Sequence, residues 1–252
     1  MAENRQFHLG KAPAAKDNRN VLFAALLKPK KLVFPSKFDA DAKLSPKPPL
    51  PMFANDTLGC CVIAARAHQT LRFERNETGT YPKITDAQVK AEYFRQTGGA
   101  DSGLVILDSL KLWRRDGWKA GNQKLRIKLF AQVRNFDKDS VASSIYSDVG
   151  VQAGVSLPLS AQDQLDNGQP WEVSSGPRAR ANSWGGHAIY LTAYNETYIT
   201  CVTWGRKQRM TWGFFLRYSD ECYATFDEVN SGRSTVIDHA AVASAVNSLS
   251  GG

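Results

Sequence analysis

The sequence has no run of 18 or more apolar residues, although 42% of its 252 residues are hydrophobic. A helix that spans a bilayer needs about 20 such residues, so no membrane span is expected. The first 20 residues carry charges with no apolar segment behind them, which argues against a secretory signal. The hydrophobic content is still sufficient for a complete core, and a globular domain is therefore predicted.

Cysteine is scarce as well, with only four residues in the chain, Cys60, Cys61, Cys201 and Cys222. Four cysteines cannot form the disulfide scaffold of a chain this long, so a reducing cytoplasm is the expected location. Two of them are adjacent and no C-x-x-C pair occurs. Adjacent side chains diverge, so no metal site is predicted, and no other cofactor is implied.

Acidic residues are few in the first fifth of the chain. Residues 1–50 hold ten Lys and Arg, four Asp and Glu, and six prolines, so most of the net charge of +8 lies there. We interpret residues 1–37 as an extended basic arm that adds little to the packed interior, because prolines interrupt regular structure and lysines resist burial. The arm lacks interleaved aromatic residues, so nucleic acid is not the expected partner. Its apolar run, residues 21–27, could dock on another subunit or across the protein's own cleft.

The rest of the chain changes character near residue 150. Apolar spacing and capping residues predict helices at about 60–76, 85–97, 104–116 and 137–149, with a capping box at Thr85 and Gln88 and a stop at Gly117. Runs of β-branched and aromatic residues then predict strands at 150–157, 187–194, 197–204 and 210–218, before a last helix at 238–249. Helices followed by a mostly antiparallel sheet indicate an α+β fold.

The paired cysteines stand where an irregular segment becomes a helix. Backbone N–H groups and the dipole at a helix N-terminus stabilise a thiolate, but a nucleophile also needs a base and donors for an oxyanion. His68 follows on the same helix about 10 Å away, too far to touch the sulfur, and is assigned a packing or surface role. His187 follows two glycines at the start of a predicted strand and is the candidate base.

Three strings in order resemble the papain-like cysteine peptidases, from about residue 38 to residue 223. They are NDTLGCCVIAA at 55–65, GGHAIYLTAY at 185–194, and the TYITCVTWG string at 197–205 with the later MTWGFFLRY. The chain also resembles a narrower group of uncharacterised bacterial and phage proteins that share N-D-x-x-G-D-C, S-W-G-G-H-A and V-T-W-G…M-T-W. The resemblance implies a papain-like domain at 38–252, with a helical lobe at about 55–150, a sheet lobe at about 151–226 and a C-terminal helix at about 238–248.

The resemblance also implies the site. The family pattern puts the nucleophile at Cys61, the base at His187 and the oxyanion donor six residues before the nucleophile, at Asn55, with the Cys61 N–H as second donor. If the nucleophile were Cys60, the same spacing would place the oxyanion donor at Ala54, whose side chain has no hydrogen-bond donor. Asn55 replaces the usual Gln and is one methylene shorter, so its loop must lie further inward. A thiol facing an imidazolium at a helix start should have a depressed pKa.

The pattern departs from the family where an Asn usually orients the histidine. The aligned residue is Thr203, or Val202 if the register shifts by one. An NSWG string does occur at 182–185, but it lies before the histidine. We interpret it as a loop that matches the family's string by coincidence, although Asn182 could still contact His187 from there.

Two function classes follow from these residues. The first is a thiol hydrolase that cleaves a peptide or related amide bond of a protein or peptide substrate. The second is a catalytically weak or inactive papain-like scaffold with a structural or binding role, such as a virion component that self-associates or binds a virion protein through the arm. The corresponding locations are the cytoplasm or a virion.

Overall fold

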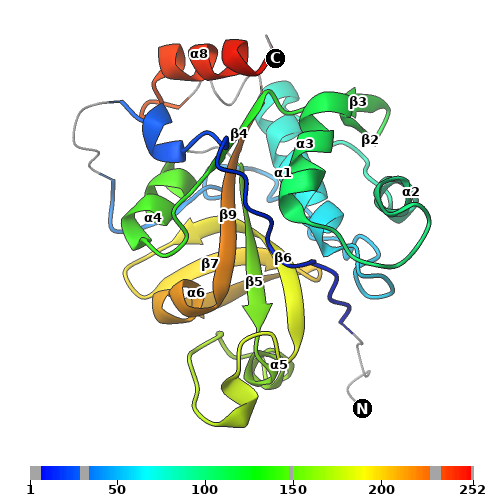
Figure 1. The fold of residues 1–252 in the computed structure, drawn as a ribbon, viewed down its shortest axis with the longest axis vertical. Coiled ribbons are helices and arrows are strands. Elements are labelled where there is room, and N and C mark those ends of the chain that lie inside the picture. Colours follow the sequence, from blue (N-terminus) through cyan, green and yellow to red (C-terminus); the bar gives the residue numbers. More distant parts are fainter. Residues whose placement is uncertain (1–6, 29–33, 148–149, 228–233, 251–252) are drawn as a thin grey trace.

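The protein is described by a computed structural model that covers residues 7–28, 34–147, 150–227 and 234–250. Residues 1–6 and 29–33 of the predicted arm lie outside the described residues. The chain forms a group of helices on one side and a sheet on the other, and the N-terminal segment runs between them (Figure 1). No helix among the described residues is long and apolar enough to cross a membrane.

The helical lobe is built around α1 (Cys61–Thr78), which is buried continuously from its first residue to Glu74. Around it lie α2 (Asp86–Thr97), α3 (Ile106–Asp116) and the hairpin of β2 (Trp118–Ala120) and β3 (Gln123–Leu125). The predicted capping box of α2 is present: Gln88 N–H donates to the Thr85 hydroxyl, and the Gln88 side chain accepts from the Thr85 N–H. Local sequence signals therefore predicted the start of α2 correctly.

The sheet lobe contains a seven-stranded sheet whose main path runs β4-β9-β5-β6-β7-β8, with β1 paired to β6. Every described pairing in it is antiparallel, as predicted. The strands are β1 (Phe38–Asp39), β4 (Leu129–Gln132), β5 (Gly150–Leu157), β6 (Gly185–Tyr194), β7 (Tyr198–Thr203), β8 (Arg206–Thr211) and β9 (Ser219–Phe226). The remaining elements are η1 (Phe23–Leu26), α4 (Lys138–Tyr146), α5 (Leu159–Asp166), η2 (Pro177–Ala179), α6 (Trp212–Tyr218) and α8 (His239–Ser250).

The strand predicted at 210–218 is wrong from residue 212 on, because only residues 210 and 211 belong to a strand, at the end of β8. Residues 212–218 form α6, whose N-cap Thr211 accepts a hydrogen bond from the Phe214 N–H at 3.2 Å. The aromatic residues that suggested a strand recur at helical spacing, and Trp212, Phe214 and Tyr218 are all buried. The strand that closes the sheet is β9, directly after this helix, and the sequence prediction missed it.

The arm contributes to the core, contrary to the sequence prediction. Phe23 and Leu26 in η1 are each 2% exposed. The Phe23 ring stacks on Phe226 of β9, with centroids 6.4 Å apart. The apolar run at 21–27 therefore docks on the protein's own sheet lobe beside β9 and α8, because β4 and β9 leave an apolar face that η1 covers.

Two hydrophobic clusters meet where α1 lies against the sheet. One lies inside the sheet lobe and the other inside the helical lobe, and the second includes Ala188 of β6 and Tyr223 of β9. Gln152 of β5 donates a hydrogen bond to the carbonyl of Val62 at 3.0 Å, which ties the first turn of α1 to the sheet. The N-terminus of α1 is thereby held against the residues that open β6.

Candidate active site

Cys61 is the first residue of α1 and is 1% exposed. Its Sγ accepts a hydrogen bond from the Ala188 N–H at 3.4 Å, and the Gly10 N–H also donates to it. These donors favour the thiolate, but burial outweighs them and raises the pKa of the thiol to about 11. The sequence prediction of a depressed pKa is therefore wrong for this arrangement, in which the arm covers the sulfur.

His187 lies on β6, immediately before Ala188, and is fully buried. Its Nε2 is 2.6 Å from Oγ1 of Thr203, the last residue of β7. Its Nδ1 has no hydrogen-bond partner among the described residues. Burial lowers the pKa of His187 to about 3, so the ring is neutral here. A buried ring nitrogen left unpaired is uncommon and directs attention to the site as a functional one.

Trp204 completes the surroundings of the imidazole. Its ring stacks on His187 with centroids 3.8 Å apart and an interplanar angle of 14°. Trp171 and Trp184 pack against Trp204 in turn, at 6.4 and 5.3 Å between centroids. This aromatic wall excludes water from the Thr203–His187 contact and fixes the plane of the imidazole ring.

Asn55 is held by a tight turn before α1. The two residues in front of it, Phe53 and Ala54, have φ values of 54° and 60°. Such left-handed conformations cost about 1–2 kcal/mol for a residue with a Cβ, and they are found where the chain must place a side chain closely. Asn55 is 1% exposed, and its Nδ2 donates to the carbonyls of Leu58 at 3.0 Å and His8 at 3.1 Å.

Residues 7–12, here called the arm segment, lie extended over these side chains. The His8 carbonyl accepts hydrogen bonds from Asn55 Nδ2 and from Trp204 Nε1, the latter at 3.3 Å. The Lys11 N–H donates to the Gly186 carbonyl on β6 at 3.1 Å. On the helical side, the arm segment pairs in parallel with Leu104 through bonds of 2.8 and 2.9 Å. Main-chain hydrogen bonds thus join one extended peptide to both lobes.

Glycines make this close approach possible. A Cβ on Gly10 would lie 1.8 Å from the carbonyl oxygen of Gly59, and one on Gly186 would lie 2.2 Å from the carbonyl oxygen of Lys11. Real Cβ atoms never come so near, so these positions accept only glycine while the arm segment is in place. The N-terminal arm was predicted from composition, but nothing in its sequence indicated that Gly10 would contact the thiol.

The other candidates from the sequence lie elsewhere. Asn182 is exposed and has no hydrogen bond to His187, and residues 182–184 of the NSWG string form the loop that leads into β6. Val202 pairs with Tyr190 across the sheet, and Thr203 is the residue that reaches the imidazole. His68 is buried, with its ring centroid 4.8 Å from that of Phe53, so of the two predicted roles, packing or surface, it has the packing one.

Cys60 is buried behind Cys61. Its Sγ donates to the Phe53 carbonyl at 3.4 Å, and burial raises the pKa of its thiol far above the usual range. No group of three His, Cys, Asp or Glu side chains that could hold a metal ion occurs within the described part of the chain.

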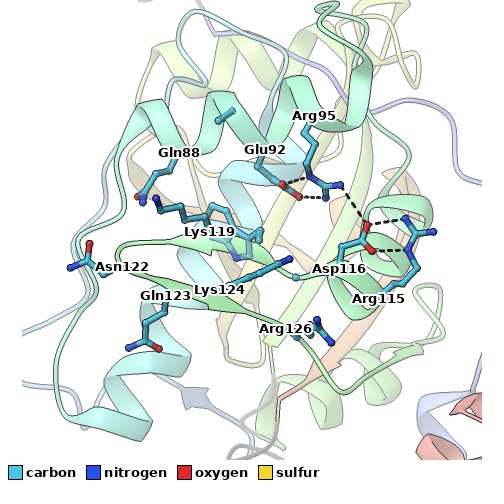
Figure 2. A pocket seen from close by; sticks show the side chains of 13 residues that line it. Gln88, Glu92, Arg95, Arg115, Asp116, Lys119, Asn122, Gln123, Lys124 and Arg126 are labelled. Carbon is cyan, nitrogen blue, oxygen red and sulfur yellow. Dashed lines mark hydrogen bonds and ion pairs between the residues drawn. The ribbon is translucent and has the colours of Figure 1, made fainter.

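A separate cavity of about 680 Å³ lies on the helical lobe, between α2, the end of α3 and the β2–β3 hairpin. Figure 2 shows Glu92 and Asp116 bonded to Arg95, with Arg115 on the far side of Asp116. The other cationic side chains around these pairs come from the β2–β3 hairpin and the residue after it, namely Lys119, Lys124 and Arg126. This cavity lacks every predicted site residue.

Solved structures resemble this arrangement over most of the chain. Xylellain, a cysteine protease from Xylella fastidiosa, superposes with a TM-score of 0.65 at 17% identity, covering 90% of this chain and 99% of that chain. The fold is papain-like. The cysteine protease CMS1MS2 of Carica candamarcensis matches with a TM-score of 0.56 at 15% identity, over 77% of this chain and 99% of that one. Procathepsin B S9 from Trypanosoma congolense matches with a TM-score of 0.57 at 12% identity, over 88% of this chain and 87% of that one.

Sequence comparison adds no nearer relative, since no protein-family model and no curated protein sequence matches the chain. The papain-like fold predicted from short strings is confirmed by three-dimensional similarity.

Proposed function

We propose that this protein is a papain-like cysteine peptidase that is kept latent by its own arm segment. The observation that supports this most is the extended peptide bound directly over a thiol at a helix N-terminus. Its main chain bonds to Leu104 on one side and to Gly186 on the other. A site that holds one peptide through main-chain groups can hold another, because those groups are common to all peptides.

The proposed roles combine the family pattern with the contacts described above. Once the arm segment leaves, His187 takes the proton of the Cys61 thiol, and the resulting thiolate attacks the carbonyl carbon of the substrate. The Asn55 amide, which now holds the His8 carbonyl, would hold the oxyanion together with the Cys61 N–H. The imidazolium then gives its proton to the leaving amine, the C–N bond breaks, and water hydrolyses the thioester to regenerate the thiol.

Thr203 takes the position of the orienting residue. Its hydroxyl accepts from the Nε2–H of His187, which leaves Nδ1 as the basic nitrogen. This tautomer agrees with an Nδ1 that has no hydrogen-bond partner among the described residues. A hydroxyl is shorter and less directional than an amide, but the Trp204 ring restricts the imidazole as well.

Latency follows from the same geometry. With the arm segment seated, the thiol pKa is about 11 and the imidazole pKa is about 3, so neither group is charged at neutral pH. Several of the structures with similar folds are proforms, among them procathepsin L 3 of Tenebrio molitor and the Amb a 11 cysteine protease of ragweed pollen.

The alternative is a papain-like scaffold without activity, with a structural or binding role such as that of a virion component in the bacterial and phage group. It is favoured by the Thr203 substitution and by the fully covered thiol. The two proposals differ in one property, the reactivity of Cys61 after the arm segment is displaced.

The test is covalent labelling by the epoxide E-64, mapped by mass spectrometry in a full-length Gly10→Ala variant. The peptidase proposal expects Cys61 to be labelled and buried Cys201 and Cys222 to be spared. Hydrolysis of a peptide library should disappear in Gly10→Ala/Cys61→Ala and persist in Gly10→Ala/Cys60→Ser. Absence of both labelling and hydrolysis in a folded Gly10→Ala protein would leave the scaffold alternative.

A further inference from the structure

The side chain of Lys11 is buried beside the thiol, with 1% of its surface exposed. Its Nζ lies 2.9 Å from Oδ2 of Asp220 and 3.3 Å from Oε1 of Glu221, both at the start of β9. It also donates to the carbonyl of Ala12 at 3.0 Å. An ammonium group is costly to bury unless it is paired and hydrogen-bonded, and these acceptors meet that requirement.

The walls of this pocket suit a long cationic side chain. A Cβ on Gly154 of β5 would lie 2.2 Å from Cε of Lys11, so the glycine leaves the space that the lysine stem fills. The Ser156 hydroxyl donates to Asp220 Oδ2 at 3.0 Å and orients that carboxylate. Gly154 and Ser156 lie on the same face of β5, two residues apart.

Glu221 provides the buried part of the negative charge. It is 3% exposed, its Oε1 lies 3.3 Å from Lys11 Nζ, and the hydroxyl of Tyr223 on the same strand also donates to it. Burial raises its pKa to about 7, although the charge of Lys11 acts in the opposite direction. A carboxylate held this way gains more from a cation than an exposed one does, because little water screens the pair.

The pocket adjoins the proposed reaction centre. The residue before Lys11 donates its N–H to Cys61 Sγ, and the Lys11 N–H itself bonds to the residue before His187. A peptide that replaces the arm segment would therefore place one side chain in the same pocket, within a few residues of the attacked carbonyl.

We infer that the pocket of Gly154, Asp220 and Glu221 is a specificity subsite for a Lys or Arg side chain of the substrate, and that Lys11 occupies it as a built-in ligand. This inference rests on the proposed peptidase function for its catalytic meaning. The binding preference itself requires only that the pocket be vacated.

Full-length Gly10→Ala vacates the pocket, since its Cβ cannot fit against Gly59. Its Cys61 is to be labelled with peptidyl fluoromethyl ketones that carry lysine at the first, second or third residue from the reactive group. Each lysine reagent is compared with an otherwise identical reagent that carries norleucine, which has an unbranched aliphatic side chain and no charge. We expect one lysine reagent to label at least tenfold faster than its partner. Glu221→Gln or Asp220→Asn should reduce that ratio several-fold, while Asp163→Asn should leave it unchanged, because Asp163 lies exposed on α5 and pairs with Arg178.

A second measurement does not depend on the chemistry of the thiol. In Gly10→Ala/Cys61→Ala, binding of the nonapeptide FHLGKAPAA (residues 7–15) is compared with the same peptide carrying norleucine in place of Lys11. We expect at least tenfold tighter binding of the lysine peptide. Labelling of Cys61 without a preference for lysine, or equal binding of the two peptides, overturns the subsite and leaves the peptidase proposal intact. Discrimination between the peptides without any labelling supports the subsite and removes the peptidase proposal.

Discussion

A single methyl group at residue 10 should activate the thiol. In Gly10→Ala the new Cβ would lie 1.8 Å from the Gly59 carbonyl oxygen and 2.3 Å from its carbon. Both atoms belong to backbone and cannot rotate away, so the arm segment must lift. Overpacking of this kind costs about 1–3 kcal/mol, which shifts the equilibrium between seated and released arm by about 5- to 150-fold.

The gain in reactivity depends on the thiolate population. With a pKa of about 11, roughly one Cys61 in 10⁴ is ionised at pH 7. If release restores an ordinary thiol pKa near 8.5, about 3% is ionised, a rise of roughly 300-fold. This 300-fold rise is the largest acceleration possible, and it is reached only if every molecule releases its arm segment. Because only a fraction of the molecules does so, we expect alkylation of Cys61 by iodoacetamide to accelerate at least tenfold.

The assay is the rate of Cys61 carbamidomethylation at pH 7, followed by mass spectrometry. Gly213→Ala is the matched control, because a Cβ there meets nothing within 4 Å and the backbone is ordinary. Thermal denaturation checks that both variants remain folded. An alkylation rate in folded Gly10→Ala equal to that in Gly213→Ala would show that the arm segment does not control access to the thiol.

Three further predictions concern orientation, stability and pH. In the Gly10→Ala background, Thr203→Ala should lower the hydrolysis rate about tenfold, because it removes the hydrogen-bond partner of His187 Nε2. Thr203→Asn should retain the rate, since an amide can replace the hydroxyl. Equal rates for Gly10→Ala and both double variants would refute the orienting role. Phe23→Ala should destabilise the fold by about 3–5 kcal/mol, because the Phe23 side chain is buried in the core. The thermal midpoint should fall in this variant and not in Gly10→Ala, since the arm segment covers only the site. Because the pKa of His187 is about 3 under the arm and ordinarily 6.5, protonation of His187 alone should make release about 30-fold more favourable at pH 5 than at pH 7.5. The variant for this test is Glu221→Gln, because the pKa of Glu221 is about 7 under the arm and its return to an ordinary value on release would act in the opposite direction. Hydrogen exchange at the arm amides, corrected for the intrinsic rate, measures this shift, and unchanged protection would contradict it.

Local signals in the sequence determined the elements whose ends are capped or whose spacing is regular. The capping box at Thr85, the stop at Gly117 and the strand at 150–157 all occur where they were predicted. The same signals failed at 210–218, since β-branched and aromatic content does not distinguish a short aromatic helix from a strand.

The order of short strings was enough to predict the papain-like fold, and the choice of Cys61, His187, Asn55 and Thr203 came from that resemblance. Their contacts could not be derived the same way. Whether a threonine reaches the imidazole depends on the antiparallel register of β6 and β7, and whether Asn55 points inward depends on two left-handed residues before it.

Only the tertiary structure decided the state of the site. The composition of the arm predicted an extended basic segment that adds little to the packed interior, because lysine is rarely buried. The fold instead places Lys11 against two acidic residues more than 200 positions away and Gly10 against the thiol. The pKa of a thiol depends on how much water and charge surround it, so burial by a distant segment reversed the shift that the helix N-terminus alone would give.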